Sequence, residues 1–296
     1  MTNSKKPYAR AYLRTLLVVS VLVVGLSGCK GSSSNSSSIP SSSETELESP
    51  QSNTQANFDC NTSTTSLTPQ IISGIIKFLD KDFDQNGLTG TTTCKPVKYA
   101  DVQIVKSSDS SVLASGMTDS LGRYAISGTN LLGETVYVRA LTSSAISNKK
   151  ITVKSGTSNS LYSVISEDFL FGSDGVVKEL TVPVDSVAAR PFNLFSVMMN
   201  GAIFIETITG AVLPSGTTGF YPNAADDGTY FSPPDIYICA KCGVDDDGWD
   251  DTVIMHEFGH FVANVYSKDD SQGGHHTLAG HFELPLTWSE GWATFF

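Results

Sequence analysis

The sequence predicts a multidomain α+β protein in which an antiparallel β-sandwich domain precedes a mixed α+β domain. Between residues 71 and 141, short runs of alternating polar and apolar residues are separated by turn formers at intervals of roughly 8–12 residues, which is typical of a small sandwich. After residue 188 the apolar residues recur with helical spacing instead. A chain of 296 residues has room for about two such domains.

Residues 1–28 have the features of a lipoprotein signal peptide. The start is basic and lacks acidic residues, and residues 15–28 form an apolar run that is too short to span a bilayer comfortably. The tetrapeptide LSGC resembles the bacterial lipobox, which implies that Cys29 is lipidated and becomes the mature N-terminus. A plain transmembrane anchor with an incidental cysteine is the alternative. We expect an exported protein that its lipid holds at the membrane of the bacterial cell envelope.

Residues 29–66 are expected to form a flexible tether. The segment is rich in serine and poor in large apolar residues, so it cannot bury a core. The signal peptide holds four of the 19 basic residues, which leaves 15 basic against 30 acidic residues in the mature part. This acidic balance argues against nucleic acid or anionic lipid as a partner.

Residues 67–165 are expected to form the β-sandwich domain. Its strand-like runs occupy residues 71–80, 99–109, 111–119, 122–128 and 134–141, and a further run lies at 149–156. The segment PVKYADVQIVKSSDSSVLASGMTDSLGRYAISG resembles the prealbumin-like or carboxypeptidase-regulatory-like β-domains. The resemblance implies the same sandwich fold and, by itself, no particular activity.

The turn after the first strand leaves calcium binding open. Asp82, Asp84, Asn86 and Gly87 place oxygen ligands on alternate residues, as at the start of a calcium-binding loop. However, Thr93 stands where such a loop needs a bidentate glutamate. A hairpin rich in turn formers explains the same residues.

Residues 166–296 are expected to form the second domain. Its elements are a strand at 176–185, a buried helix from about Pro191 to Gly210, an edge strand at 229–240 that Pro233-Pro234 interrupts, and a helix capped by Asp250 or Asp251.

The capped helix carries the segment VIMHEFGHFV, which contains the pattern H-E-x-x-H. His256 and His260 are four residues apart, so on a helix they lie on one face and can bind one Zn²⁺. Glu257 lies beside them and can act as general base towards a metal-activated water and as acid towards the leaving amine. Apolar flanks indicate a buried helix, where two histidines and a glutamate without a partner would be costly. Gly259 disfavours the helix by about 1 kcal/mol relative to alanine, so we expect a packing partner or a ligand close to it.

The H-E-x-x-H pattern could also occur by chance. If it binds zinc, a third ligand must come from elsewhere in the chain. The longer signature H-E-x-x-H-x-x-G-x-x-H is excluded, because Ala263 and Tyr266 stand at the positions of its glycine and last histidine. Glu290 follows later in a second helix-prone stretch that it opens.

The segments DDTVIMHEFGHFV and WSEGWATFF together resemble gluzincin-type zinc metallopeptidases of bacterial surfaces. The resemblance implies a zincin-like domain in which His256, His260 and Glu290 bind zinc and Glu257 is the general base and acid. Thr294 departs from the pattern, because thermolysin-like members have an aspartate there that orients a histidine. That support is expected to come from elsewhere in the chain.

Further histidines lie between the two segments. His275 and His276 belong to a Gly-Gly-His-His loop that is either exposed or lines the cleft, where a histidine could stabilise an oxyanion. His275, His276, His281 and Glu283 are competing metal ligands.

Four cysteines remain besides Cys29, an even number for an oxidising compartment. We expect a local disulfide between Cys239 and Cys242 and a second one between Cys60 and Cys94. A structural zinc site is less consistent with their spacing, because Cys60 and Cys94 do not form a matching pair.

These residues predict a zinc metallopeptidase that hydrolyses a peptide or protein substrate. The alternative is a non-catalytic surface lipoprotein whose β-sandwich binds a partner or glycan while the peptidase domain is a remnant. Hydrolysis of a non-peptide amide or ester also fits the motif. Only six residues follow Glu290, so we expect the peptidase domain to be truncated and this chain to bind zinc weakly and to have little activity.

Overall fold

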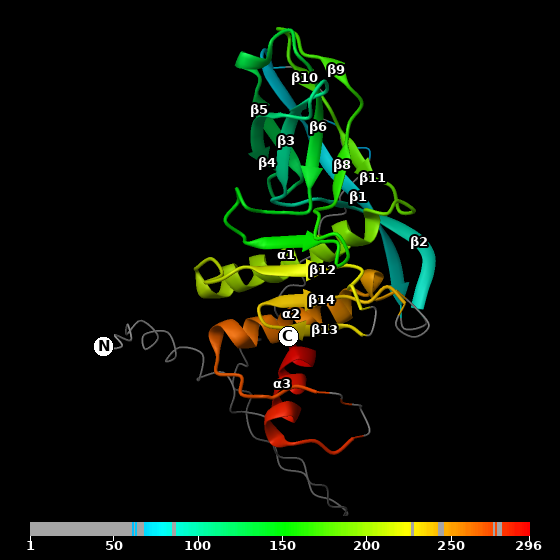
Figure 1. Cartoon of the computed structure of the whole chain (residues 1–296), viewed down its shortest axis with the longest axis vertical. Helices are drawn as coiled ribbons and strands as arrows, with labels where there is room; N and C mark the ends of the chain where they lie inside the picture. The colour runs from blue at the N-terminus through cyan, green and yellow to red at the C-terminus, as the bar shows by residue number, and fades with distance from the viewer. Residues whose placement is uncertain are drawn as a thin grey trace, which may run out of the picture. The chain divides into compact units, whose positions relative to one another are not determined.

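The structure, a computed structural model, describes residues 61, 63, 68–84, 87–225, 228–241, 246–274, 276 and 280–296. The chain divides into two compact units, Met1–Asn53 and Thr54–Phe296, and all described residues belong to the second. The signal peptide, Cys29 and most of the tether therefore lie outside the described residues. The second unit is a mixed α+β structure with three sheets and three α-helices among the described residues (Figure 1).

The first sheet is built around one long strand. β1 (Ile71–Asp84) pairs antiparallel with β5 (Arg123–Ser127) and β2 (Gly87–Pro96), and parallel with β10 (Val176–Val177) and β11 (Leu180–Val182). A wholly antiparallel sandwich was therefore the wrong expectation. A parallel pair needs a long crossover connection, and the segment between β5 and β10, which passes through both other sheets, provides one.

The second sheet is antiparallel and packs on the first through a shared core. It has the order β4-β3-β6-β8, with β9 also on β6; its strands are β3 (Asp101–Lys106), β4 (Val112–Met117), β6 (Thr135–Leu141), β8 (Ser163–Ile165) and β9 (Phe169–Leu170). A short 3-10 helix, Thr129–Leu131, precedes β6. Alternating apolar residues of β3 and β6 lie in one buried cluster with residues of β1, as a sandwich requires.

The third sheet lies next to the helices and has the order β13-β14-β12-β7. β7 (Ile151–Lys154), β12 (Thr217–Phe220) and β14 (Asp235–Tyr237) are parallel, and β13 (Tyr230–Ser232) is the antiparallel edge strand. The sheets do not divide at the domain boundary expected at residue 165. Before it, β7 joins the third sheet, and after it, β9, β10 and β11 return to the sandwich. Sequence-local patterns do not show which sheet a strand joins.

The Pro-Pro segment separates two strands instead of interrupting one. Pro233 and Pro234 form the turn between β13 and β14, so the expected single strand at 229–240 is a hairpin. Proline lacks the N–H that a sheet ladder needs, which suits a turn better than a strand interior.

Helix α1 (Ala189–Thr209) agrees with the predicted helix. Pro191 lies in its first turn, and Gly210 ends it in the left-handed conformation, with φ of 69°. By length and hydropathy α1 is the one helix among the described residues that could cross a membrane, but 61% of its apolar window is buried inside the protein. Its packing is that of a core helix.

Helix α2 (Asp251–Tyr266), which carries the H-E-x-x-H pattern, follows a short 3-10 helix, Asp247–Trp249, and is fixed at its start by three contacts. Asp250, one of the two predicted N-cap residues, is the N-cap, and its carboxylate accepts two backbone N–H groups of the first turn. Asn193 of α1 donates to Asp251 over 2.9 Å, and Lys95 of β2 forms an ion pair with the same carboxylate over 3.4 Å. The N-cap alone contributes about 1 kcal/mol. The sandwich hairpin and the core helix thus both position α2.

The middle of α2 packs closely on α1. The ring of Phe258 is fully buried, and a Cβ at Gly201 of α1 would lie 2.6 Å from it. Glycine at that position lets the two helices approach. The histidine face of α2 is therefore supported from behind by the core.

Helix α3 (Leu284–Phe295) brings Glu290 to α2. It begins six residues before Glu290, not at Glu290 as expected, because Pro285 fits the first turn of a helix, where no N–H donor is needed. The helix passes over Gly259, where a Cβ would lie 3.0 Å from the Cα of Ala293. The indole N–H of Trp292 donates to the Gly259 carbonyl over 2.9 Å. Helix α3 is the packing partner that the mid-helix glycine predicts.

Candidate metal centre

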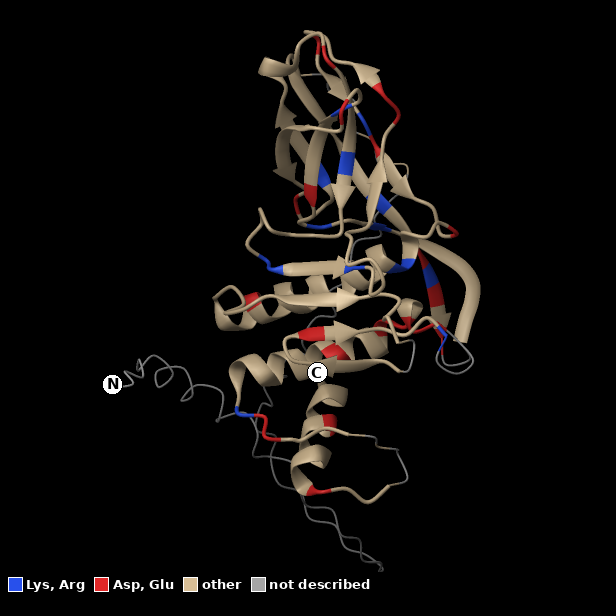
Figure 2. Ribbon diagram, viewed as in Figure 1, with Lys and Arg blue, Asp and Glu red and all other residues tan. Residues whose placement is uncertain are grey.

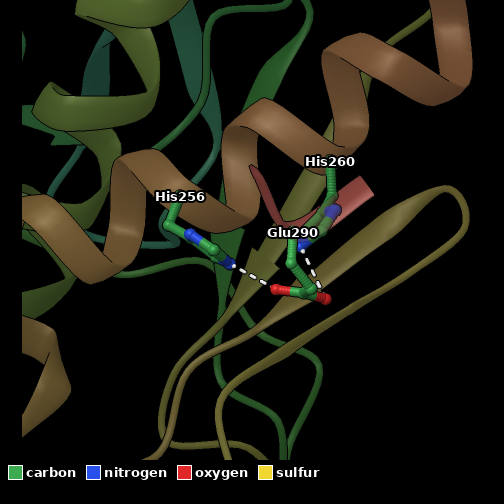
Figure 3. Close-up of side chains that lie close together, drawn as sticks. All are labelled: His256, His260 and Glu290. Atoms are coloured by element: carbon green, nitrogen blue, oxygen red, sulfur yellow. Dashed lines mark hydrogen bonds and ion pairs between the residues drawn. The ribbon is translucent and has the colours of Figure 1, made fainter. Parts of the chain in front are cut away.

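Two elements bring the three predicted ligands together. His256 and His260 lie one turn apart on α2, and Glu290 faces them from α3 (Figure 3). One ligand atom from each residue lies within 4.8 Å of the other two. The Glu290 carboxylate lies between the rings, with Oε2 at 3.1 Å from Nε2 of His256 and Oε1 at 3.5 Å from Nε2 of His260.

The electrostatics of this cluster favour a cation. Burial disfavours the charged form of Glu290, but the hydrogen bond with His256 and the nearby rings of His260 and His276 outweigh it and hold the pKa of that carboxyl well below its usual value. The hydrogen bond with Glu290 raises the pKa of His256. A carboxylate and two imidazole nitrogens that converge in this way need positive charge between them, from a proton or from a metal ion. Imidazole nitrogen and carboxylate oxygen are ligands of zinc.

Glu257 lies beside the cluster and contacts the edge strand. Its side chain is buried, with the residue 8% exposed, and this burial raises the pKa of the carboxyl against the opposing effect of His260 and His256. The backbone of Phe231 in β13 also acts to lower this pKa, as the smallest of the effects. The Phe231 ring stacks on His260, with centroids 6.5 Å apart. A carboxyl whose pKa is raised towards the working pH is suited to accept and return a proton.

The cluster opens into a cavity of about 780 Å³. β13, α2, α3 and the segment after α2 all line it, and its acidic residues are Glu257, Asp269 and Glu290. No lysine or arginine is found among the described residues that line the cavity. Figure 2 shows the same bias along α3 and the segment before it, where Lys268 is the single basic residue. A cavity with three carboxyl groups and no lysine or arginine among its described lining residues attracts a cation.

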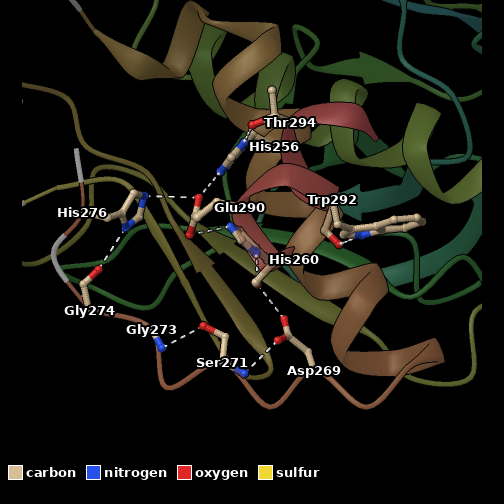
Figure 4. A network of polar contacts seen from close by, with 12 residues as sticks. His256, His260, Asp269, Ser271, Gly273, Gly274, His276, Glu290, Trp292 and Thr294 are labelled. Carbon is tan, nitrogen blue, oxygen red and sulfur yellow. Dashed lines mark hydrogen bonds and ion pairs between the residues drawn. The ribbon is translucent and has the colours of Figure 1, made fainter. Parts of the chain in front are cut away.

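The far nitrogens of both histidine rings also have polar contacts (Figure 4). Nδ1 of His260 lies 3.2 Å from Oγ of Ser289, and Ser289 donates its hydroxyl to Asp269 over 2.8 Å. Nδ1 of His256 lies 3.4 Å from Oγ1 of Thr294. Thr294, which stands where thermolysin-like proteins have an aspartate, therefore still places an oxygen next to Nδ1 of His256. Ser289 and Asp269 provide polar contacts on the corresponding side of His260.

His276 lines the cavity and reaches the cluster. Its Nε2 lies 3.2 Å from Oε2 of Glu290, and its Nδ1 lies 2.9 Å from the Gly274 carbonyl. His275 lies outside the described residues. His281 and Glu283 line a separate hollow and are not part of the ligand cluster.

The other predicted sites lie away from the cavity. Asp82 accepts a hydroxyl from Thr91 over 2.7 Å, and hydrogen bonds from Thr93 and Thr91 lower the pKa of its carboxyl, as the hairpin interpretation of this turn requires. Asn86 lies outside the described residues, and calcium binding stays a prediction. Among the described residues, no second cluster of ligands for a metal is found.

The cysteines are oxidised where the structure describes them. Cys94 and Cys239 are disulfide-bonded. Cys60 and Cys242 lie outside the described residues, so the expected pairing stays a prediction.

The sequence did not single out Asp269, Ser289, Phe231 or Trp292 as site residues. Ser289 directly precedes the predicted ligand, and a small polar residue there was the one available signal. Asp269 lies in the polar loop after α2 but contacts Ser289 of α3, and Phe231 lies on a strand well before α2, so no local pattern shows these contacts.

Comparisons with known proteins give little beyond this geometry. No protein-family model matches the chain, and no curated protein matches it. Solved structures that match include 5-hydroxyisourate hydrolase of Klebsiella pneumoniae, 16% identical over 40% of this chain and 92% of that one, with a TM-score of 0.23. (S)-Allantoin synthase is 12% identical over 41% and 43% of the two chains, with a TM-score of 0.22. A 9R-lipoxygenase of Cyanothece PCC8801 is 11% identical over 50% and 27%, with a TM-score of 0.18.

Proposed function

We propose that this protein is a zinc-dependent hydrolase of the gluzincin type that cleaves peptide bonds. One observation carries the proposal: ligand atoms of His256, His260 and Glu290 lie within 4.8 Å of one another, beside the buried Glu257 and in one cavity. The resemblance of the two motif segments to gluzincins supports a peptide as the substrate. An ester or another amide would meet the same groups.

The donor set fits zinc in a catalytic arrangement. His256, His260 and Glu290 would hold the metal with three protein ligands, the number that leaves a position open in catalytic zinc sites. When bound, zinc makes a water molecule more acidic and polarises the substrate carbonyl. Glu257 removes a proton from the attacking water and delivers it to the leaving nitrogen as the C–N bond breaks, so the carboxyl is restored after each turnover. The raised pKa of Glu257 supports this double role.

Zinc binding is the first measurement, because it tests the three ligands without a substrate. Wild-type protein titrated against a chromophoric chelator should bind one zinc ion per chain. Glu290→Gln keeps the size of the side chain but removes the charged ligand, and it should weaken zinc binding by at least about 10-fold. Glu283→Gln is the matched control, since it makes the same change outside the cluster and should leave the affinity unchanged. Absence of zinc from the wild type, or equal affinities of all three proteins, contradicts the proposed site.

Glu257→Gln separates metal binding from catalysis. The substitution preserves shape and leaves all three ligands in place, so zinc should still bind. Hydrolysis of a fluorogenic peptide library, followed at high protein concentration over long incubations, should fall by about 10²- to 10⁴-fold. Equal turnover in the wild type and in Glu257→Gln would exclude the assigned role. Parallel assays with ester and non-peptide amide substrates identify the bond that is cleaved.

We also propose that the protein is a lipid-anchored lipoprotein of the bacterial envelope. The basic start, the apolar run and the lipobox-like LSGC support this location. Cys29→Ser should abolish incorporation of labelled fatty acid and leave an uncleaved signal peptide. Unchanged labelling of the Cys29→Ser protein would contradict the assignment.

A further inference from the structure

A chain of two hydrogen bonds runs from the loop after α2 to a predicted metal ligand. Asp269 accepts the hydroxyl of Ser289 over 2.8 Å, and Oγ of Ser289 lies 3.2 Å from Nδ1 of His260. Ser289 is 3% exposed, and His260 is 9% exposed. Water therefore has little access to the contact between Ser289 and His260, and buried polar groups of this kind are costly without a partner.

The donors and acceptors of this chain define where the protons lie. A carboxylate only accepts hydrogen bonds, so Ser289 donates its single O–H to Asp269. Ser289 then has only lone pairs to offer to His260, so Nδ1 of His260 carries a hydrogen and donates it. In a neutral imidazole this leaves Nε2 with a free lone pair. Nε2 is the atom that faces Glu290 in the cluster.

We propose that Asp269, acting through Ser289, is a positioning residue that holds His260 in the tautomer and ring orientation that bind a metal ion. The proposal rests on the function proposed above, because it assigns the ligand atom of that site. A direct contact between a metal-binding histidine and a carboxylate is common, and here a serine stands between the two.

The surroundings of Asp269 support a role at the site. Its second oxygen accepts the backbone N–H of Ser271 over 3.1 Å, and Asp269, Ser271 and Ser289 all line the cavity. Ser289 is also one of only two buried residues of α3, with Ala293 as the other. The same contacts therefore fasten the loop, α3 and the His260 ring to one another.

A double-mutant cycle on metal affinity tests the proposal. The proteins are wild type, Ser289→Ala, Asp269→Asn and the double variant, each titrated with zinc and with cobalt against a chromophoric chelator. Each single substitution should weaken binding by about 10-fold or more and change the cobalt absorption spectrum. Because Asp269 acts through Ser289, the double variant should bind no more weakly than Ser289→Ala. Additive losses in the double variant would overturn the relay.

Two matched controls exclude general effects on helix α3 and on charge. Thr287→Val removes a hydroxyl from the same helix, where it contacts only the Glu283 carbonyl, and Asp270→Asn removes the neighbouring negative charge. Both should bind metal as the wild type does. Asp269→Asn is nearly isosteric and keeps an oxygen for Ser271, so it carries the test if Ser289→Ala does not fold.

A metal-free measurement separates failure of this proposal from failure of the proposed function. Long-range ¹H–¹⁵N spectra of the metal-free wild type should show His260 protonated at Nδ1, and Ser289→Ala should lose this preference. If the wild type shows this tautomer but binds no metal, the proposed function fails and the positioning contact stands. If the wild type binds metal and Ser289→Ala binds it equally well, with the same spectrum and tautomer, the positioning role alone is overturned.

Discussion

The two helices that supply the ligands are held in different ways. Helix α2 buries half of its residues, against α1, β13 and β14 as well as against α3. Its motif histidines face Glu290 of α3. Helix α3 buries only Ser289 and Ala293 and packs mainly against α2. Its Leu284 is 84% exposed and its Phe295 is 85% exposed. Glu290 thus stands on the less anchored element.

This difference indicates which ligands are in position before a metal ion binds. The core determines the positions of His256 and His260, whereas the position of Glu290 depends on a few contacts between α3 and α2. Those contacts are the close approach at Gly259, the Trp292 hydrogen bond and the polar contacts around the rings. A metal ion would add the strongest link between the two helices.

The largest effect should come from a substitution in helix α2, the more deeply packed of the two helices. Phe258→Ala removes a fully buried ring from the contact between α1 and α2 and should destabilise the fold by about 3–5 kcal/mol. Phe295→Ala on the exposed face of α3 should change stability by less than about 0.5 kcal/mol. Urea unfolding followed by circular dichroism measures both. Similar losses in the two variants would show that the helices are equally anchored.

Zinc should stabilise α3 more than α2. At a zinc concentration about 100 times the Kd, the bound state gains about 2.7 kcal/mol over the free state. Hydrogen exchange with and without a chelator should therefore show amides of α3 slowing by up to about 100-fold on zinc addition, while core amides of α2 change little. An equal change in both helices contradicts the idea that α2 is formed in advance.

Gly259→Ala tests the close approach of the helices directly. A Cβ there would lie 3.0 Å from Ala293 and 3.1 Å from Phe296, so α3 must shift outward. We expect a loss of about 1–3 kcal/mol from overpacking, larger than the gain of about 1 kcal/mol in helix propensity, together with weaker zinc binding. Unfolding curves and zinc titration measure the two effects. Unchanged zinc affinity would show that Glu290 does not depend on this contact.

The smallest effect should come from Thr294→Val. Its hydroxyl contact with His256 is long, at 3.4 Å, and Thr294 is exposed. We expect zinc affinity to fall only a few-fold, less than the loss of about 10-fold or more expected for Ser289→Ala. The same chelator titration compares them. A larger loss for Thr294→Val would reverse the order of importance of the two contacts.

Local patterns predicted the elements of the fold better than their partners. The helix from Pro191 to Gly210 and the Asp250 cap agree with the structure, because capping residues and apolar spacing act within a few residues. The membership of β7 in the third sheet and the parallel pairing of β10 and β11 were not predicted. Strand pairing depends on contacts between distant segments, which alternation along one strand does not encode.

The candidate site shows the same division. The spacing of His256 and His260 on a helix predicted their common face with Glu257 beside them, and the resemblance of two segments implied Glu290. The hydrogen bonds of Ser289 and Asp269 and the stacking of Phe231 on His260 could not be predicted from the sequence, because each joins residues from separate elements.

By itself, the sequence determined that two histidines project from one turn of a helix with a glutamate beside them, since helical geometry follows from local backbone hydrogen bonding. It also determined that Gly259 needs a close neighbour. Only the tertiary structure decided that this neighbour is α3, that Glu290 lies between the rings, and that Ser289 and Asp269 stand behind His260. These features depend on how packed helices and a loop converge, and packing is a property of the whole fold.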